Sequence, residues 1–211
     1  MNHIIRTLLF IFAILFSTSV FSADKLNSPF FKMDSISNKI VYQPLQVKLG
    51  FNLGWEFPYS IGMECSFLFS ELVDANIGCG IGMSGFKVGV GARIYPIRKK
   101  KTSPMIGAYF YHASGLGTLN VNVNEDAGTY SIPSDNAVLV NAGFRTRFKK
   151  GHYLIAGIGY SIPYKGERAQ YQSGSESSSL QSFADAFRVG GFSINVGILI
   201  KLTKGYYRTF E

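Results

Sequence analysis

The sequence predicts an all-β protein: an eight-stranded antiparallel transmembrane β-barrel that follows an N-terminal signal peptide. Three observations predict it. Eight long segments alternate between apolar and polar residues, the face opposite the apolar one is rich in glycine, and the first residues are typical of an export leader. The length of 211 residues fits a leader and one domain. Charged residues make up only 16% of the chain, where a soluble domain carries about 25%.

Residues 1–22 have the features of a cleaved secretory signal peptide. Arg6 supplies a positive charge, residues 8–16 are an unbroken apolar run, and small polar residues follow. This run is about half of the roughly 20 residues that a membrane-spanning helix needs. We expect cleavage after Ser22, and then a periplasmic segment (23–44), the barrel (45–202) and a short C-terminal tail (203–211). Whether residues 23–44 form a loose tail or enter the barrel stays open.

The alternating segments are long enough to cross a bilayer as tilted strands. They cover residues 45–55, 59–69, 73–83, 86–94, 104–112, 138–148, 154–162 and 192–202. Strict alternation indicates strands, because successive side chains of a strand point to opposite faces. A transmembrane strand needs about 9–11 residues, whereas the average strand of a globular protein has about five or six.

The glycine-rich face is predicted to line the inside of the barrel. A water-exposed strand face would hardly be built from residues such as Gly78, Gly80, Gly89 and Gly91, because glycine weakens strands. An eight-stranded barrel is just wide enough to be filled by side chains, so long polar groups need neighbours without side chains. The predicted polar network of the lumen consists of Glu64, Asp74, Lys87, Arg93, Arg145 and Arg147. We expect it to fill the barrel as ion pairs rather than to form a pore.

The connections are predicted to be short on one side and long on the other. An even number of strands places both ends of the barrel on one side, which is the periplasm in bacterial barrels. The long loops, 113–136 and 163–185, then face outward, and the low-complexity stretch 172–179 is expected to be mobile. Any extracellular ligand would bind these loops. Aromatic girdles are expected at both interfaces, from Trp55, Phe57 and Tyr59 outside and from Tyr95, Phe148 and Tyr153 inside.

The leader, the alternating segments of residues 45–202 and the glycine-rich lumen resemble the small bacterial outer-membrane β-barrels, the superfamily of the outer-membrane protein A barrel and the opacity-type surface proteins. The resemblance implies a location in the outer membrane after export. It also implies outer-membrane lipid, lipopolysaccharide and the barrel-assembly machinery as partners.

Basic residues concentrate at the predicted periplasmic end, although the formal net charge of the whole chain is only +8. They lie at positions 98–101, 149–150, 204 and 208. Solvated turns are the simpler interpretation, and contact with an anionic periplasmic partner is the alternative. No nucleic-acid-binding module is recognisable, so nucleic acid is not expected as a partner.

The two cysteines allow two interpretations. Cys65 and Cys79 are predicted on the lipid face of adjacent strands, and they are direct cross-strand neighbours if the turn between them centres on Leu72. Such neighbours lie close to disulfide geometry, whereas a shift of two residues in register leaves two free thiols. No spacing of histidine and cysteine predicts a metal site, and no cofactor is expected.

These observations favour a structural or surface-interaction protein of the outer membrane. One alternative is a lipid-modifying hydrolase, because His112 and Ser114, with Asp126 following, faintly resemble the catalytic residues of lipid A deacylases. A His two residues from a Ser is frequent by chance, so an enzyme is the less favoured interpretation. A third possibility is a transporter that passes small hydrophobic molecules through a lateral opening.

Overall fold

The computed structural model describes residues 31–33, 40–42, 46–70, 72–97, 101–123, 126–148, 151–174, 177–202 and 208–209. The predicted signal peptide lies outside these residues. The chain divides into two compact units, residues 46–204 and the flanking residues 1–45 with 205–211. In the flanking unit, β2 (Ile40–Tyr42) pairs with both β1 (Phe31–Met33) and β14 (Arg208–Thr209). The segments before and after the barrel therefore share one small sheet.

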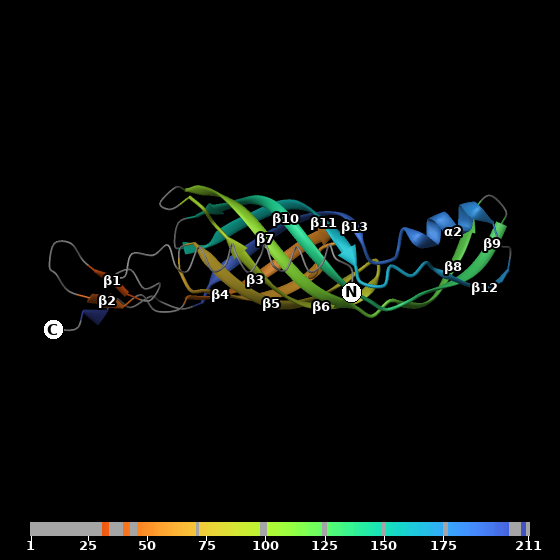
Figure 1. Cartoon of the computed structure of the whole chain (residues 1–211), viewed down its shortest axis with the longest axis horizontal. Helices are drawn as coiled ribbons and strands as arrows, with labels where there is room; N and C mark the ends of the chain where they lie inside the picture. The colour runs from red at the N-terminus through yellow and green to blue at the C-terminus, as the bar shows by residue number, and fades with distance from the viewer. Residues whose placement is uncertain are drawn as a thin grey trace. The chain divides into compact units, whose positions relative to one another are not determined.

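Eight strands of the larger unit close into an antiparallel barrel, with the order β10-β11-β13-β3-β4-β5-β6-β7 (Figure 1). The strands are β3 (Gln46–Trp55), β4 (Ile61–Leu68), β5 (Val73–Gly82), β6 (Gly85–Ile94), β7 (Thr102–Ala113), β10 (Asp135–Arg147), β11 (Tyr153–Pro163) and β13 (Gly191–Lys201). The predicted eight-stranded barrel is confirmed, and each predicted strand corresponds to one observed strand. Among the described residues, no helix is both long and apolar enough to cross a membrane.

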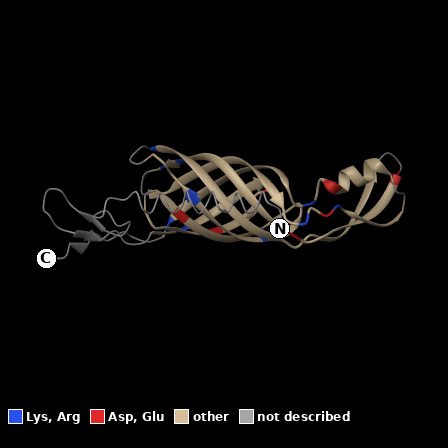
Figure 2. Cartoon of the chain, in the orientation of Figure 1, with Lys and Arg blue, Asp and Glu red and all other residues tan. Residues whose placement is uncertain are grey.

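The barrel has two distinct ends. Gln46 begins β3 and Lys201 ends β13 at one of them, which we call the terminal end. The opposite end, which we call the lobe end, carries the two long insertions of the barrel, between β7 and β10 and between β11 and β13. Most of the barrel ribbon carries no charged residue (Figure 2).

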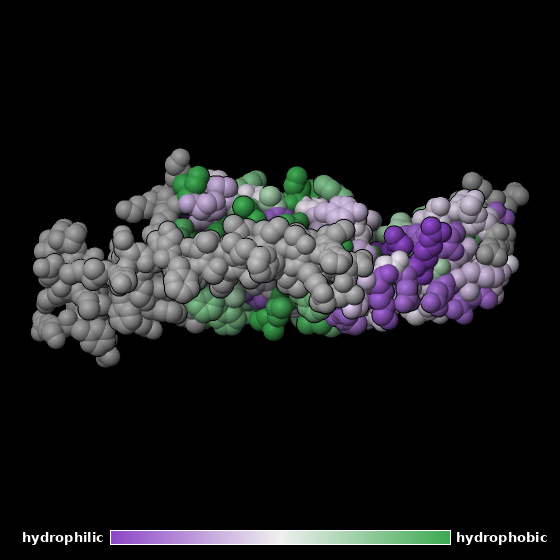
Figure 3. All heavy atoms as spheres, in the orientation of Figure 1, coloured by the Kyte–Doolittle hydropathy of each residue, from purple (hydrophilic) through white to green (hydrophobic). Residues whose placement is uncertain are grey.

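Apolar side chains cover the outside of the barrel, and its charged side chains are buried inside together with aromatic and aliphatic ones. Ile61 and Ile81, a cross-strand pair, are 68% and 66% exposed, whereas Lys48, Arg93 and Glu64 are buried. Figure 3 shows hydrophobic residues on the barrel and hydrophilic residues on the visible face of the two insertions. The predicted assignment of the glycine-rich, polar face to the lumen therefore agrees with the structure.

Glycine makes room for large lumen side chains, as the sequence suggested. A Cβ added at Gly91 of β6 would collide with the ring of Tyr109 on β7. A Cβ at Gly50 of β3 would lie 2.5 Å from Cγ of Glu64 on β4. Protein interiors are close-packed, so these glycines allow long neighbours to cross the narrow barrel.

Part of the predicted aromatic girdles is wrong. Trp55 and Phe148 are exposed on the outside, but Phe57, Tyr59, Tyr95 and Tyr153 are buried. The loop after β3 turns inward, where Glu56 and Ser60 have positive φ angles of 46° and 31°, so the alternation of β3 does not continue through it. Tyr95 lies two residues after Arg93, and Tyr153 lies two residues before Ile155. Each tyrosine therefore points into the barrel, as its neighbour does.

The two long insertions form one folded lobe. Its sheet has the order β12-β9-β8, from β8 (Leu116–Val123), β9 (Asp126–Ile132) and β12 (Gln170–Gly174). The helix α2 (Ser178–Asp185) is capped by Ser177, whose hydroxyl accepts a hydrogen bond from Leu180 N. Leu180 and Ala184 pack with Val121 and Tyr130 in a core of the lobe's own. Residues 172–174 belong to β12 and residues 178–179 begin α2, because a serine-rich helix still buries one apolar face. The mobility of residues 172–179 stays a prediction.

Candidate functional site

The lumen of the barrel is filled by large side chains. Those that are fully buried include Lys48, Phe57, Tyr59, Lys87, Arg93, Tyr95, Met105, Tyr109, Tyr111, Leu139 and Ile155. They come from β3 and the loop after it, from β6 and the residue after it, and from β7, β10 and β11. They belong to two groups, one toward each end. The filled lumen agrees with the expectation that an eight-stranded barrel is packed rather than open.

Arg93 organises the group toward the terminal end. Its Nε donates to Asp74 Oδ1 at 2.8 Å, and its Nη2 donates to Glu64 Oε1. Asp74 also accepts a hydrogen bond from the Tyr95 hydroxyl at 2.6 Å. All four side chains are buried. A buried charge is tolerated only when it is paired, and here one guanidinium pairs with two carboxylates.

Two further cations of this group lie over aromatic rings. The guanidinium of Arg145 is 3.5 Å from the ring centre of Tyr95, and the ammonium of Lys48 is 4.1 Å from that of Tyr153. The negative face of an aromatic ring attracts a cation, most strongly where water is excluded. Tyr95 and Tyr153, which the sequence placed at the membrane interface, therefore hold cations inside the barrel.

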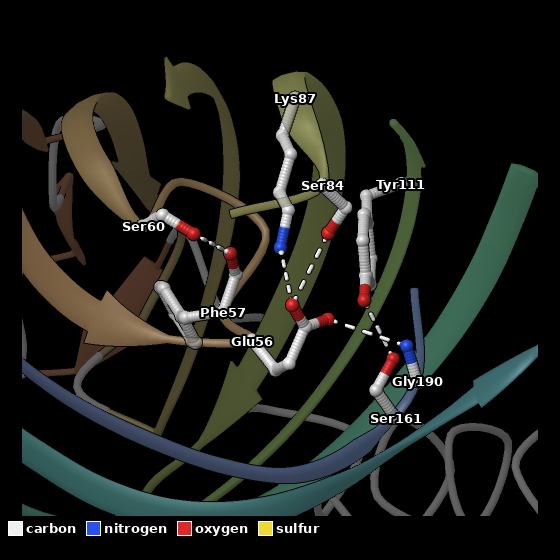
Figure 4. Close-up of polar contacts among 8 residues, drawn as sticks. All are labelled: Glu56, Phe57, Ser60, Ser84, Lys87, Tyr111, Ser161 and Gly190. Carbon is white, nitrogen blue, oxygen red and sulfur yellow. Dashed lines mark hydrogen bonds and ion pairs between the residues drawn. The ribbon is translucent and has the colours of Figure 1, made fainter. Parts of the chain in front are cut away.

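Glu56 organises the group toward the lobe end (Figure 4). Its Oε1 accepts hydrogen bonds from Ser84 Oγ at 3.1 Å and from Lys87 Nζ at 3.3 Å. Its Oε2 accepts a hydrogen bond from Gly190 N at 3.3 Å. One buried carboxylate thus joins the β3–β4 loop, the β5–β6 turn, β6 and the residue that precedes β13.

Aromatic rings fill the barrel beneath Glu56. Phe57 contacts Tyr59 and Tyr109 edge to face, with ring centres 5.5 and 5.1 Å apart. The Tyr59 hydroxyl donates to Asn76 Oδ1. The inward-folded loop therefore closes this end of the lumen with apolar rings.

The structure places five of the six residues of the predicted polar network inside the barrel, in two separate groups. Arg145 lies over Tyr95 in the group toward the terminal end. Glu64, Asp74 and Arg93 form one cluster, and Lys87 pairs with Glu56 instead. Arg147 is not in the lumen. It lies two residues after Arg145, so strand alternation alone predicts that it points inward. It is, however, the last residue of β10 and is exposed beyond the end of the filled lumen. Glu56 was missed because it lies in a loop, where alternation gives no direction.

His112 and Ser114 are both exposed near the lobe end, and each bonds to other groups. His112 Nδ1 lies 3.0 Å from Asn136 Oδ1. Ser114 Oγ accepts a hydrogen bond from Phe86 N at 3.0 Å and donates one to the carbonyl oxygen of Gly115 at 3.1 Å. Asp126 begins β9 in the lobe. In the described part of the chain, no group of His, Cys, Asp or Glu is arranged to hold a metal ion.

Cys65 and Cys79 are free thiols. Cys65 pairs with Ile77, and Cys79 pairs with Met63, so the two cysteines are offset by two residues. The hairpin centres on position 71 rather than on Leu72, and this shift removes the disulfide geometry that a turn at Leu72 would have provided.

Comparisons with known proteins find similarity in structure but not in sequence. The N-terminal β-barrel domain of Pseudomonas aeruginosa OprF has a TM-score of 0.45 and 12% identity, covering 76% of this chain and 99% of that domain. Acinetobacter baumannii CarO has a TM-score of 0.41 and 13% identity, covering 75% and 98%. No protein-family model matches the chain, and no curated protein matches it in sequence. The closed barrel itself confirms the fold that the resemblance to small outer-membrane barrels implied.

Proposed function

We propose that this protein is an outer-membrane β-barrel that holds a folded lobe at the cell surface for interaction with an extracellular ligand. The observation that carries the proposal is the inverted distribution of side chains: charges lie inside and a belt of large apolar residues lies outside. Soluble monomers rarely expose apolar patches of this extent. A bilayer removes the free-energy cost of exposing the apolar belt to water, because the belt then contacts hydrocarbon.

The orientation follows from the topology. Both ends of the barrel segment lie at the terminal end, and both insertions lie at the lobe end. In bacterial barrels with an even strand number, the chain ends face the periplasm. The lobe then faces outward, and lipopolysaccharide and outer-membrane lipid surround the belt.

The lobe is the part of the molecule that supports an interaction role. It has its own apolar core, so its surface is held by a rigid scaffold, which is how many proteins present their binding residues. Tyr164, Tyr171 and Phe183 are exposed in the insertion that contains the helix. Exposed aromatic side chains of this kind are frequent at protein–protein contacts.

A labelling experiment on intact cells tests both the orientation and the exposure of the lobe. In a background with Cys65→Ala and Cys79→Ala, one variant carries Ser182→Cys on α2, and its matched control carries Lys101→Cys at the terminal end. Both positions are exposed in the structure. A membrane-impermeant maleimide should label position 182 on intact cells and position 101 only after lysis. Labelling of position 101 alone on intact cells would reverse the orientation.

A further inference from the structure

The terminal end of the barrel carries exposed cations on neighbouring strands. Lys101 precedes β7, Arg147 ends β10 and Lys201 ends β13. Arg147 N donates to the carbonyl oxygen of Lys101 at 2.7 Å, so these two residues are adjacent. Lys101 and Arg147 are exposed, and Lys201 is half-buried.

His152, in the turn between β10 and β11, connects Phe148, the residue after Arg147, with Lys201. Its carbonyl oxygen accepts a hydrogen bond from Phe148 N at 2.8 Å, and its Nδ1 accepts one from Lys201 N at 3.3 Å. Lys101, Arg147 and Lys201 thus form one arc, with His152 between the last two, over the strand ends of β7, β10, β11 and β13, which are neighbours in the barrel. We call this arc the cationic rim.

No exposed carboxylate offsets the cationic rim in the described part of the terminal end. Asp74 lies near the end of β5 on this side of the barrel. Its carboxylate is buried and bonded to Arg93 and Tyr95. The lobe end differs. There Lys87 pairs with Glu56, and Lys165 lies 3.8 Å from Glu167. The cations of the rim remain available for a negatively charged ligand.

Exposed apolar residues directly adjoin the cationic rim. Phe148 follows Arg147, and Leu202 follows Lys201, and both side chains are exposed. A soluble acidic protein or a free anion would make use of the cations only. A layer of anionic headgroups above hydrocarbon fits the cations and the apolar residues together.

We infer that the cationic rim binds the phosphate groups of anionic phospholipids in the leaflet that surrounds the terminal end. The inference rests on the proposal that the barrel spans a membrane, and it names a lipid partner and the residues that bind it. Near an anionic membrane surface, each Lys or Arg strengthens the attraction roughly fivefold. Three such residues within one arc therefore give a measurable preference for anionic over zwitterionic lipid.

Lipid binding to the purified full-length protein in neutral detergent micelles tests the inference, with bound lipids counted by native mass spectrometry. The test variant carries Lys101→Gln, Arg147→Gln and Lys201→Gln. The matched control carries Lys165→Gln, Arg168→Gln and Arg188→Gln at the lobe end and loses the same charge. At the rim, Arg147 and Lys201 make their hydrogen bonds through backbone atoms, so the test variant should keep its fold. A second variant with Lys101→Arg, Arg147→Lys and Lys201→Arg keeps the charge.

Phosphatidylglycerol should bind the parent, the lobe-end control and the charge-keeping variant alike, and it should bind the test variant at least about tenfold more weakly. Phosphatidylcholine should not distinguish them. Equal binding of phosphatidylglycerol by parent and test variant would overturn the inference, as would inorganic phosphate that displaces the lipid at equal concentration. If the proposed function is wrong and the barrel does not span a membrane, the observation differs: the parent protein itself would not fold in micelles and would stay soluble without detergent.

Discussion

Glu56 and Lys87 form a buried ion pair, with 3.3 Å between Oε1 and Nζ, at the lobe end of the barrel. The pair connects the inner face of β6 to the loop between β3 and β4, in which Glu56 has a positive φ angle. The same carboxylate holds Gly190, which lies between the lobe helix and β13. The ion pair therefore ties the closure of the lumen to the base of the lobe.

Glu56→Ala should destabilise the folded barrel by about 3–5 kcal/mol, because it leaves the ammonium of Lys87 buried without its partner. Urea unfolding in micelles measures this difference. The double variant Glu56→Ala with Lys87→Met removes both charges and should recover most of the stability. A single variant as stable as the parent would mean that Lys87 reaches water or another carboxylate.

Gly91→Ala should destabilise the barrel by about 1–3 kcal/mol, because the new Cβ overlaps the buried ring of Tyr109 and forces it to move. Gly117→Ala in β8 is the matched control, since no atom lies within 4 Å of the Cβ added there. Comparing the two variants by urea unfolding separates the clash from the general effect of replacing glycine in a strand. Equal stabilities would show that the lumen is loosely packed at Tyr109.

The strands could be predicted from the sequence because the two faces differ so strongly in this barrel. Along β13, for example, Ile194, Val196 and Ile198 alternate with Ser193, Asn195 and Gly197, and all eight barrel strands were found in this way. The register within a hairpin was harder. Period-two alternation is unchanged by a shift of two residues, so it could not decide whether Cys65 faces Cys79 or Ile77.

The lobe and the Glu56 cluster could not be predicted for a related reason. Residues of the lobe such as Val121, Tyr130 and Leu180 are separated by Asn, Gly and Ser in short segments, and they become a core only when the two insertions meet. Glu56 lies in a five-residue connection between strands, where local conformation rather than alternation sets its direction. In both places the deciding contacts join segments that lie far apart in the chain.

Ser114→Ala should leave the acyl pattern of lipid A unchanged. The Ser114 hydroxyl bonds to the backbone of Phe86 and Gly115, and the His112 ring bonds to Asn136. A serine nucleophile needs its base within hydrogen-bond reach, and neither of these contacts provides one. Mass spectra of lipid A from cells that express the parent or the variant measure the pattern, with cells lacking the protein as the control. Loss of an acyl change that only the parent produces would establish the hydrolase instead.

Ile198→Arg should cost about 2–4 kcal/mol of folding stability in a bilayer, because the guanidinium would face hydrocarbon in the middle of β13. Phe183→Arg on the lobe helix is the matched control, since Phe183 and Ile198 are 48% and 49% exposed. If only the loss of an exposed apolar side chain matters, both variants should fold like the parent. If lipid surrounds the barrel and water surrounds the lobe, only Ile198→Arg should reduce folding into phosphatidylcholine vesicles, as measured by urea titration. The difference between the two variants therefore reports which solvent each surface contacts.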